Sequence, residues 1–363
     1  MYGQAIGDAM GAPVEGWPAS RIAERFSDVV EFLPSTHGGD PESGKGGGRI
    51  TDDTLMVEAL IRAYAASGDH LDAYGFEEFF IPEIVRRPVW VPEFGREMPI
   101  MDRLWWPEKY PCVRLSINNA EPRSAGIGNC VNCGVAMYMM PVGAVNAGDP
   151  AGAYQEAAAL ALAHNESFAI EAGAVMAAAC AAAFGRDASI SSVMETASRL
   201  ARDGTRSAIK DTVAAADQSD DLGCFIQKTR AAVSPYDQRT GHTADDAPLI
   251  ASQLSDTGRP SRTAAIEELP VALAALKYGA GDFLKTIRAA VFYGRDCDSI
   301  AGMAGALWGA IYGVCGISQN LRSASDSANR RDFGKLAADF HSVILKILEN
   351  DAKRLRDREN ACR

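Results

Sequence analysis

The sequence predicts an all-α protein, and three features of the chain support that class. Alanine is abundant and often clustered, as in Ala177–Ala183, and it favours helices because its side chain loses almost no rotamer entropy there. Apolar residues recur at helical spacing, whereas runs that alternate between apolar and polar residues are scarce. No clear linker interrupts the chain, so we expect a single helical domain over residues 1–363.

Four segments carry the helical periodicity in chain order. In Thr51–Tyr64 the apolar residues repeat every three or four positions and form one stripe. Phe168–Phe184 is apolar nearly all round, which is typical of a central helix. The stripe returns in Val193–Ala201 and in Val343–Leu355. We therefore expect amphipathic helices that pack around at least one buried helix.

Three other segments are less regular. Pro34–Arg49 is rich in glycine and polar residues, so we expect a loop there. Arg86–Gly128 holds several prolines and few helix signals, which predicts an irregular excursion near the functional site. Ile300–Ile317 has no charge over 18 residues, a length that can span a membrane. Its five glycines and the lack of a second span favour a buried helix instead, so we expect no membrane contact.

Charge and cysteine usage exclude several classes of protein. The formal net charge is −11, which would repel a phosphate backbone, so nucleic acid is not an expected partner. Eight cysteines are scattered along the chain and no signal peptide is recognisable, which favours a cytoplasmic location. Cys130 and Cys133 form a C-x-x-C pair, but a structural zinc site needs four ligands and no second pair exists.

Two acidic clusters stand at the start of predicted helices, each after glycine. They are Thr51-Asp52-Asp53-Thr54 and Asp296-Cys297-Asp298-Ser299. Each fits a helix N-cap, because hydroxyl and carboxylate side chains accept hydrogen bonds from unpaired amides. Paired carboxylates exceed what a cap requires, and their hard oxygens suit Mg²⁺, Mn²⁺ or Ca²⁺. The residues alone leave both interpretations open.

Four motifs in order resemble those of the ADP-ribosylglycohydrolase family. Gly3–Glu15 (GQAIGDAMGAPVE) is similar to the opening motif, and Gly48–Thr54 (GRITDDT) resembles the first metal motif. Gly134–Gly143 resembles the central glycine motif, and Gly294–Ala301 (GRDCDSIA) resembles the second metal motif. Any one of these could arise by chance, but four in family order point to membership.

The resemblance implies an all-α fold with two Mg²⁺ or Mn²⁺ ions in a central cleft. By motif position the metal ligands would be Thr51, Asp52, Asp53, Asp296, Asp298 and Ser299. Catalytic carboxylates that orient or deprotonate water would be Asp53, Asp298 or Glu42. Substrate would lie against Asn129, Cys130, Val131, Cys133, Gly134 and His164, with backbone amides of the loop holding phosphate.

Several of these residues have an ordinary structural alternative. Glu42 resembles a functional glutamate on a flap, but a solvated loop glutamate would look the same. His164 matches a family histidine beside the ligand, or else is a hydrogen-bonded histidine at a helix boundary. For Asp8 and Glu15 in the opening motif, capping or core hydrogen bonding competes with a role in the site.

The chain departs from the family pattern at three positions. Tyr138 stands where the family usually has arginine, Cys133 where it has asparagine, and Arg295 where it has a second glycine. The expected metal ligands are intact, whereas these positions lie near the expected ligand pocket. The departures therefore put the identity of the substrate in doubt more than the hydrolytic machinery.

The residues and the resemblance together support a metal-dependent hydrolase. It would hydrolyse an N-ribosidic bond in its substrate, which would be an ADP-ribosylated protein or a ribosylated small molecule. One alternative is a non-catalytic binding or structural protein, since a lens crystallin belongs to the same family. Another is a dimetal phosphoesterase, because two-metal carboxylate sites also serve phosphate chemistry.

Overall fold

A computed structural model describes residues 1–26, 28–34, 45–91, 94–236 and 265–362, and these ranges are nearly all helical. This confirms the predicted fold class. In the first half the elements are α1 (Tyr2–Gly11), η1 (Ala12–Val14), α2 (Ala19–Arg25), α3 (Asp52–Ser67), α4 (Ala73–Gly75), η2 (Phe76–Phe80), α5 (Ile81–Val85), β1 (Pro88–Val91), β2 (Arg96–Pro99), η4 (Ile100–Asp102), α6 (Trp106–Ser116), η5 (Pro122–Ser124) and η6 (Ala136–Tyr138). In the second half they are α7 (Met140–Val145), α8 (Pro150–Ala161), α9 (Phe168–Ala183), α10 (Ile190–Leu200), α11 (Asp203–Asp217), α12 (Leu222–Val233), η7 (Ser234–Tyr236), α14 (Ala265–Gly279), α15 (Phe283–Tyr293), α16 (Cys297–Tyr312), α17 (Gln319–Asn329) and α18 (Phe333–Ala361).

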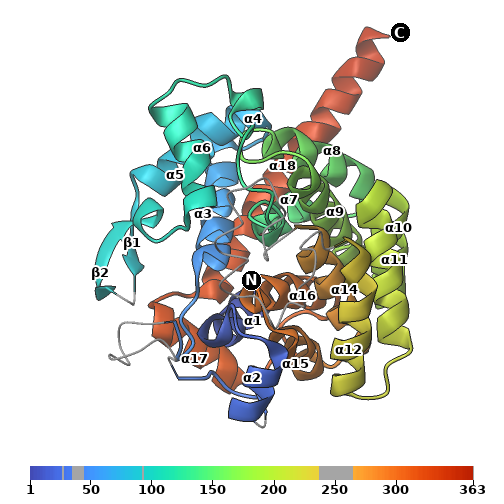
Figure 1. The fold of residues 1–363 in the computed structure, drawn as a ribbon. Coiled ribbons are helices and arrows are strands. Elements are labelled where there is room, and N and C mark those ends of the chain that lie inside the picture. Colours follow the sequence, from blue (N-terminus) through green and yellow to red (C-terminus); the bar gives the residue numbers. More distant parts are fainter. Residues whose placement is uncertain (27, 35–44, 92–93, 237–264, 363) are drawn as a thin grey trace.

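Helices α9 and α16 contact each other in the core, and several neighbouring helices pack against one or the other (Figure 1). Helix α9 is buried along almost its whole length, as its apolar sequence predicts. Helices α8, α7 and α10 lie against α9, while α1, α15 and α14 lie against α16. The C-terminal end of α18 extends away from the body of the molecule (Figure 1).

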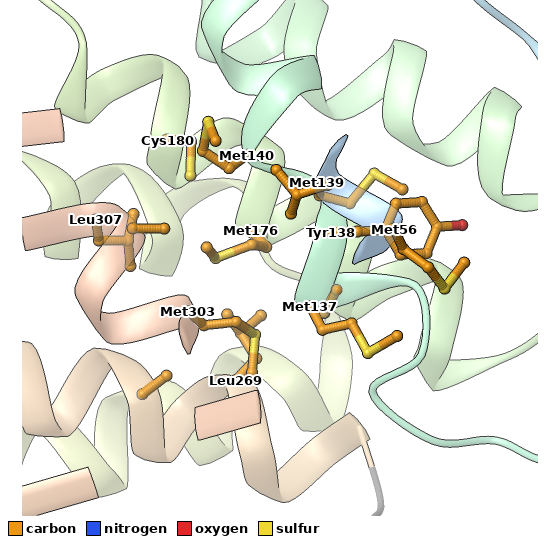
Figure 2. Close-up of a cluster of buried hydrophobic side chains, with 14 of the residues drawn as sticks. Met56, Met137, Tyr138, Met139, Met140, Met176, Cys180, Leu269, Met303 and Leu307 are labelled. Carbon is orange, nitrogen blue, oxygen red and sulfur yellow. The ribbon is translucent and has the colours of Figure 1, made fainter. Parts of the chain in front are cut away.

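Methionine side chains fill much of the space between these helices (Figure 2). They come from α3, η6, α7, α9 and α16, and Met137, Met139, Met176 and Met303 are almost completely buried. Methionine suits such a position because its unbranched, flexible side chain fills irregular gaps. This core supports the short segment η6–α7, which carries the central glycine motif.

The backbones of α1 and α16 touch along a row of small residues. A Cβ atom on Gly3 would lie 2.0 Å from the carbonyl oxygen of Gly305, and one on Gly7 would lie 2.1 Å from that of Ala301. Both distances are far below van der Waals contact, so only glycine fits at these positions. Helix α16 is therefore a buried helix of the core, and no helix in the described ranges is long and apolar enough to cross a membrane.

The excursion over residues 86–128 is more regular than predicted. It contains the antiparallel pair β1–β2, which is the one sheet in the described part of the chain, and the 11-residue helix α6. Pro111 lies inside α6 and cannot donate to the carbonyl of Pro107, four residues earlier. The side-chain amide of Asn129 donates to that carbonyl instead, over 2.8 Å. The prediction of an irregular segment is therefore wrong over Trp106–Ser116.

Candidate active site

The start of α3 is built around the carboxylate of Asp8. Asp8 lies on α1, is fully buried, and accepts hydrogen bonds from the backbone amides of Thr51 and Thr54. It also accepts from the Thr54 hydroxyl over 2.5 Å. Thr51 caps the helix, because its hydroxyl oxygen accepts from the amide of Asp53 over 3.3 Å. Since these bonds satisfy the helix end, the carboxylates of Asp52 and Asp53 are not needed as caps.

The start of α16 follows a tight turn. Gly294 and Arg295 have φ angles of 79° and 59°, so both adopt a left-handed backbone conformation. Arg295 is held in it by an amide hydrogen bond to the Trp17 carbonyl and by an ion pair with Glu267. Asp296 stands at the N-cap position, yet its side chain makes no capping hydrogen bond. The capping interpretation of this acidic cluster is therefore not supported by the geometry at Asp296.

The two helix starts bring their carboxylates into one buried cluster. Ligand atoms of Glu15, Asp296 and Asp298 all lie within 4.8 Å of one another. Burial, and then the charge of Asp298, raises the pKa of Asp8 to about 7 and that of Asp296 to about 8. Burial raises the pKa of Asp53 well above its usual range, and the charges of Asp298 and Asp8 add to the effect. Each carboxyl group is thus close enough to its neighbours to disfavour their ionisation.

The predicted metal ligands occupy this cluster with hard oxygen atoms. Thr51, Asp53, Asp296, Asp298 and Ser299 are all buried, and Asp52 is partly exposed. Within the described ranges, Asp53 Oδ1 and Asp298 Oδ1 are buried without a hydrogen-bond partner. Buried oxygens normally have hydrogen-bond partners, so two carboxylate oxygens without partners in an acidic cluster are consistent with a site for a divalent cation.

Two further charged residues near this cluster had no place in the sequence-based prediction of the site. The ammonium group of Lys45 contacts Glu15 and lies 3.6 Å from the carboxylate of Asp298. It supplies part of the positive charge that the cluster requires. Glu108, on α6, is buried, and burial followed by the charge of Asp52 raises its pKa to about 8. Their positions depend on tertiary contacts, so no local sequence signal identifies them.

The excursion over residues 86–128 contacts both the start of α3 and the predicted substrate loop. The amide of Trp105 donates to the carboxylate of Asp52 over 3.4 Å, and Glu108 accepts a hydrogen bond from Asn132 over 3.0 Å. A Cβ atom on Gly134 would lie 2.2 Å from the Glu108 carboxylate, which explains the glycine at that position. Helix α6 therefore forms one wall beside both the acidic cluster and the predicted substrate loop.

The predicted substrate loop, residues 129–134, is anchored to neighbouring segments by hydrogen bonds. Asn129 is buried and its side chain joins the Pro107 and His164 carbonyls, each over 2.8 Å. The amides of Asn129, Cys130 and Asn132 are already bonded within the chain. A phosphate group would therefore depend on the other amides of the loop, which belong to Val131, Cys133 and Gly134.

The loop reaches the acidic cluster through Cys133. Its thiol donates to Asp296 Oδ2 over 3.0 Å, and the side chain is only 3% exposed. His164 has a different environment: its ring is fully buried, stacks on Tyr138 and bonds to the Tyr138 hydroxyl over 2.7 Å. Burial lowers the pKa of His164 to about 3, so the ring is neutral. The structure does not bring this ring to the carboxylates, and Glu42 lies outside the described residues.

Comparison with known proteins adds to the geometry. The model of a family described as ADP-ribosylglycohydrolase matches residues 1–349. An uncharacterized protein of Escherichia coli strain K12, YegU, is 26% identical over 344 residues, which cover 93% of each chain. An uncharacterized Archaeoglobus fulgidus protein is 28% identical over 145 residues, 40% of this chain and 41% of that protein. A solved structure titled "ADP-ribosylglycohydrolase-related protein complex" covers 95% of this chain and 94% of its own at 20% identity, with a TM-score of 0.52.

Proposed function

The chain belongs to the ADP-ribosylglycohydrolase family, and from that premise we propose that it hydrolyses an N-ribosidic bond with the help of bound divalent cations. The substrate would be an ADP-ribosylated protein or a ribosylated small molecule. The observation that carries the proposal is the acidic cluster in which Asp296 and Asp298 lie with Glu15 within 4.8 Å, and in which Asp53 Oδ1 and Asp298 Oδ1 are buried without hydrogen-bond partners in the described ranges. Such a cluster is unfavourable without a cation, so it needs a functional explanation.

We assign the metal ligands by position in the cluster. Thr51, Asp52 and Asp53 from the start of α3, and Asp296, Asp298 and Ser299 from the start of α16, would hold two Mg²⁺ or Mn²⁺ ions. When bound, such ions fix the ribose hydroxyls and lower the pKa of a coordinated water molecule. The residues offer carboxylate and hydroxyl oxygens, which are the ligands that these hard cations prefer.

The chain's own residues would manage the proton and the developing positive charge. Cleavage of an N-ribosidic bond develops oxocarbenium-like charge on the sugar, which nearby carboxylates stabilise. Asp53 would orient and deprotonate the attacking water, because its Oδ1 has no hydrogen-bond partner in the described part of the chain. Asp298 would share that task, as the sequence predicts.

Glu15 is a further carboxylate at the mouth of the cluster. Its side chain is 34% exposed, in contrast to 3% for Asp298, so it can reach both solvent and the buried ligands. We propose that Glu15 helps to orient or deprotonate water, which is the role for which Glu42 was a sequence-based candidate. The ion pair with Lys45 would have to open for substrate or cation to enter.

Product analysis tests the function directly. The protein is incubated with Mg²⁺ and ADP-ribosyl-arginine, ADP-ribosyl-serine or simple nucleosides, with Asp53→Asn as the matched inactive variant. We expect free ADP-ribose or ribose from at least one substrate, and loss of that product in Asp53→Asn. Release of inorganic phosphate would support the phosphoesterase alternative. No product from any substrate would favour a non-catalytic binding protein.

A further inference from the structure

A second set of ligand atoms adjoins the hard oxygen cluster and shares Asp296 with it. Cys133, Glu268 and Asp296 are all buried, and their ligand atoms lie within 4.8 Å of one another. We propose that these three residues form a mixed sulfur–oxygen position that selects a thiophilic divalent cation, such as Zn²⁺, over Mg²⁺. The inference rests on the proposed function only in treating the carboxylate cluster as a cation site.

The geometry suits one cation between the three side chains. In a tetrahedral zinc site with sulfur and oxygen ligands, neighbouring ligand atoms are about 3.3–3.6 Å apart. The Cys133 sulfur already lies 3.0 Å from Asp296 Oδ2. The ligand atom of Glu268 lies within 4.8 Å of both, so small rotamer changes would bring the three atoms to the separations of a zinc site. Asp296 has two carboxylate oxygens, so it can face Cys133 on one side and Asp298 on the other.

Asp53, which is assigned above to the adjoining hard oxygen position, also has a buried oxygen without a partner in the described ranges. Asp53 is 3% exposed, and its Oδ1 has no hydrogen-bond partner among the described residues. Its unpaired oxygen therefore belongs to the hard oxygen position, and the mixed position is formed by Cys133, Glu268 and Asp296.

The chemistry of the donor set determines which cation fits. Mg²⁺ takes oxygen ligands and keeps several water molecules, whereas a thiolate favours softer ions such as Zn²⁺. On binding, a sulfur–metal bond forms as the S–H bond breaks, and the proton passes to solvent. The thiolate and the two carboxylates then carry three negative charges, which more than offset the charge of the dication, and no redox change is involved.

The test uses the full-length, metal-free protein and does not depend on catalysis. Titration with Co²⁺ reports thiolate coordination as an ultraviolet sulfur-to-cobalt charge-transfer band, and calorimetry compares Zn²⁺ with Mg²⁺. We expect the band in the wild-type protein and its loss in Cys133→Ser. The Zn²⁺ affinity of Cys133→Ser should fall by about tenfold or more, equivalent to about 1.4 kcal/mol. Its Mg²⁺ affinity should change much less.

Two matched variants keep the test decisive. Cys130→Ser removes the other thiol of the same loop and should keep the band. Glu268→Gln retains the thiol and the side-chain shape, so it should keep the band but bind Zn²⁺ more weakly. If Cys133→Ser does not fold, the Zn²⁺ affinity of Glu268→Gln alone tests the mixed-ligand site. A band that survives in Cys133→Ser, a band lost in Cys130→Ser, or unchanged Zn²⁺ affinity in Glu268→Gln would each overturn the inference.

The inference and the proposed function can fail separately. Loss of the cobalt band in Cys133→Ser without any hydrolysis product would leave the mixed-ligand site standing and remove the enzymatic proposal. Hydrolysis supported by Mg²⁺, with no sulfur-to-cobalt band in the wild type, would do the reverse.

Discussion

Replacement of Asp298 by asparagine should weaken cation binding without destabilising the metal-free protein. The carboxylate of Asp298 is within 4.8 Å of Asp296, and when both are ionised, two unit charges at that separation repel by about 3.5 kcal/mol for an effective dielectric of 20. Its charge also raises the pKa of Asp8 and Asp53, after the effect of burial. Asparagine keeps the shape of the side chain and removes this repulsion.

One attraction opposes the gain. Lys45 lies 3.6 Å from Asp298, and the same treatment gives an attraction of about 5 kcal/mol before solvent screening. The variant loses this attraction, but solvent screens it because Lys45 is one-quarter exposed, and Lys45 keeps its ion pair with Glu15. The variant also removes the repulsion between Asp298 and three other carboxylates, those of Asp8, Asp53 and Asp296. We therefore expect Asp298→Asn to raise the free energy of unfolding of the metal-free protein by about 0–2 kcal/mol.

The stability of the metal-free protein should decrease as pH rises, and the variant should change how steeply it does so. The pKa of Asp8 and Asp296 is raised from 3.8 to about 7 and about 8 in the folded protein. The folded state therefore holds protons that the unfolded state has lost, and stability falls as pH rises from 4 to 8. Without the charge of Asp298 this fall should be shallower.

Two measurements check the prediction. Thermal unfolding of both proteins in chelator is followed at several pH values between the usual and the raised pKa values, and cation binding is measured by calorimetry at neutral pH. Cation affinity should drop by at least about tenfold, since a charged ligand is lost. Equal affinity and an equal fall of stability with pH in both proteins would refute the reasoning and favour a simple capping role for Asp298.

Three other predictions follow from the same structure. Gly7→Ala places a Cβ 2.1 Å from the carbonyl oxygen of Ala301, so urea denaturation should show a loss of about 3 kcal/mol or more; a loss below about 1 kcal/mol would contradict the close helix contact. Hydrogen bonding to Glu156 raises the pKa of His70 to about 9, so its contribution, about 1–2 kcal/mol after screening, should be full below pH 6.5 and lost as pH rises through 9. Thermal unfolding of His70→Gln should lack that step. Asn129→Ala removes two buried hydrogen bonds that the side chain donates and one that it accepts from the Cys130 amide, so it should lower the free energy of unfolding by about 2 kcal/mol or more in denaturant titration; wild-type stability would be the contrary result.

The fold class and the acidic helix starts could be predicted because their signals are local. Helical periodicity and the Asp-Asp and Asp-Cys-Asp patterns are visible in short windows of sequence. The helix α6 was missed for a physical reason. Pro107 lies in its first turn, where a proline removes no hydrogen bond, and the carbonyl freed by Pro111 is satisfied by Asn129 from a distant loop. Proline in a sequence window gives no information about such a distant donor.

The site itself was predictable only in part. The approach of Cys133 to Asp296 joins residues that are 163 positions apart, and the Lys45–Asp298 pair joins more distant ones. No periodicity or spacing encodes such contacts. Arg295 was recognisable as a departure from glycine, but its support by Glu267 and Trp17 could be seen only in the structure.

The close contact of α1 with α16 explains how the chain tolerates this cluster of buried carboxylates. Desolvation raises the pKa of Asp8 and Asp296, so their ionised forms oppose folding at neutral pH. The opposing stabilisation comes from the surrounding structure: α16 lies backbone against backbone on Gly3 and Gly7, and Asp8 accepts three separate donors from the start of α3. Because the core holds the carboxylates in place before a cation arrives, binding energy is not consumed in gathering the ligands. A bound cation should therefore raise the unfolding temperature by relieving repulsion rather than by ordering the chain.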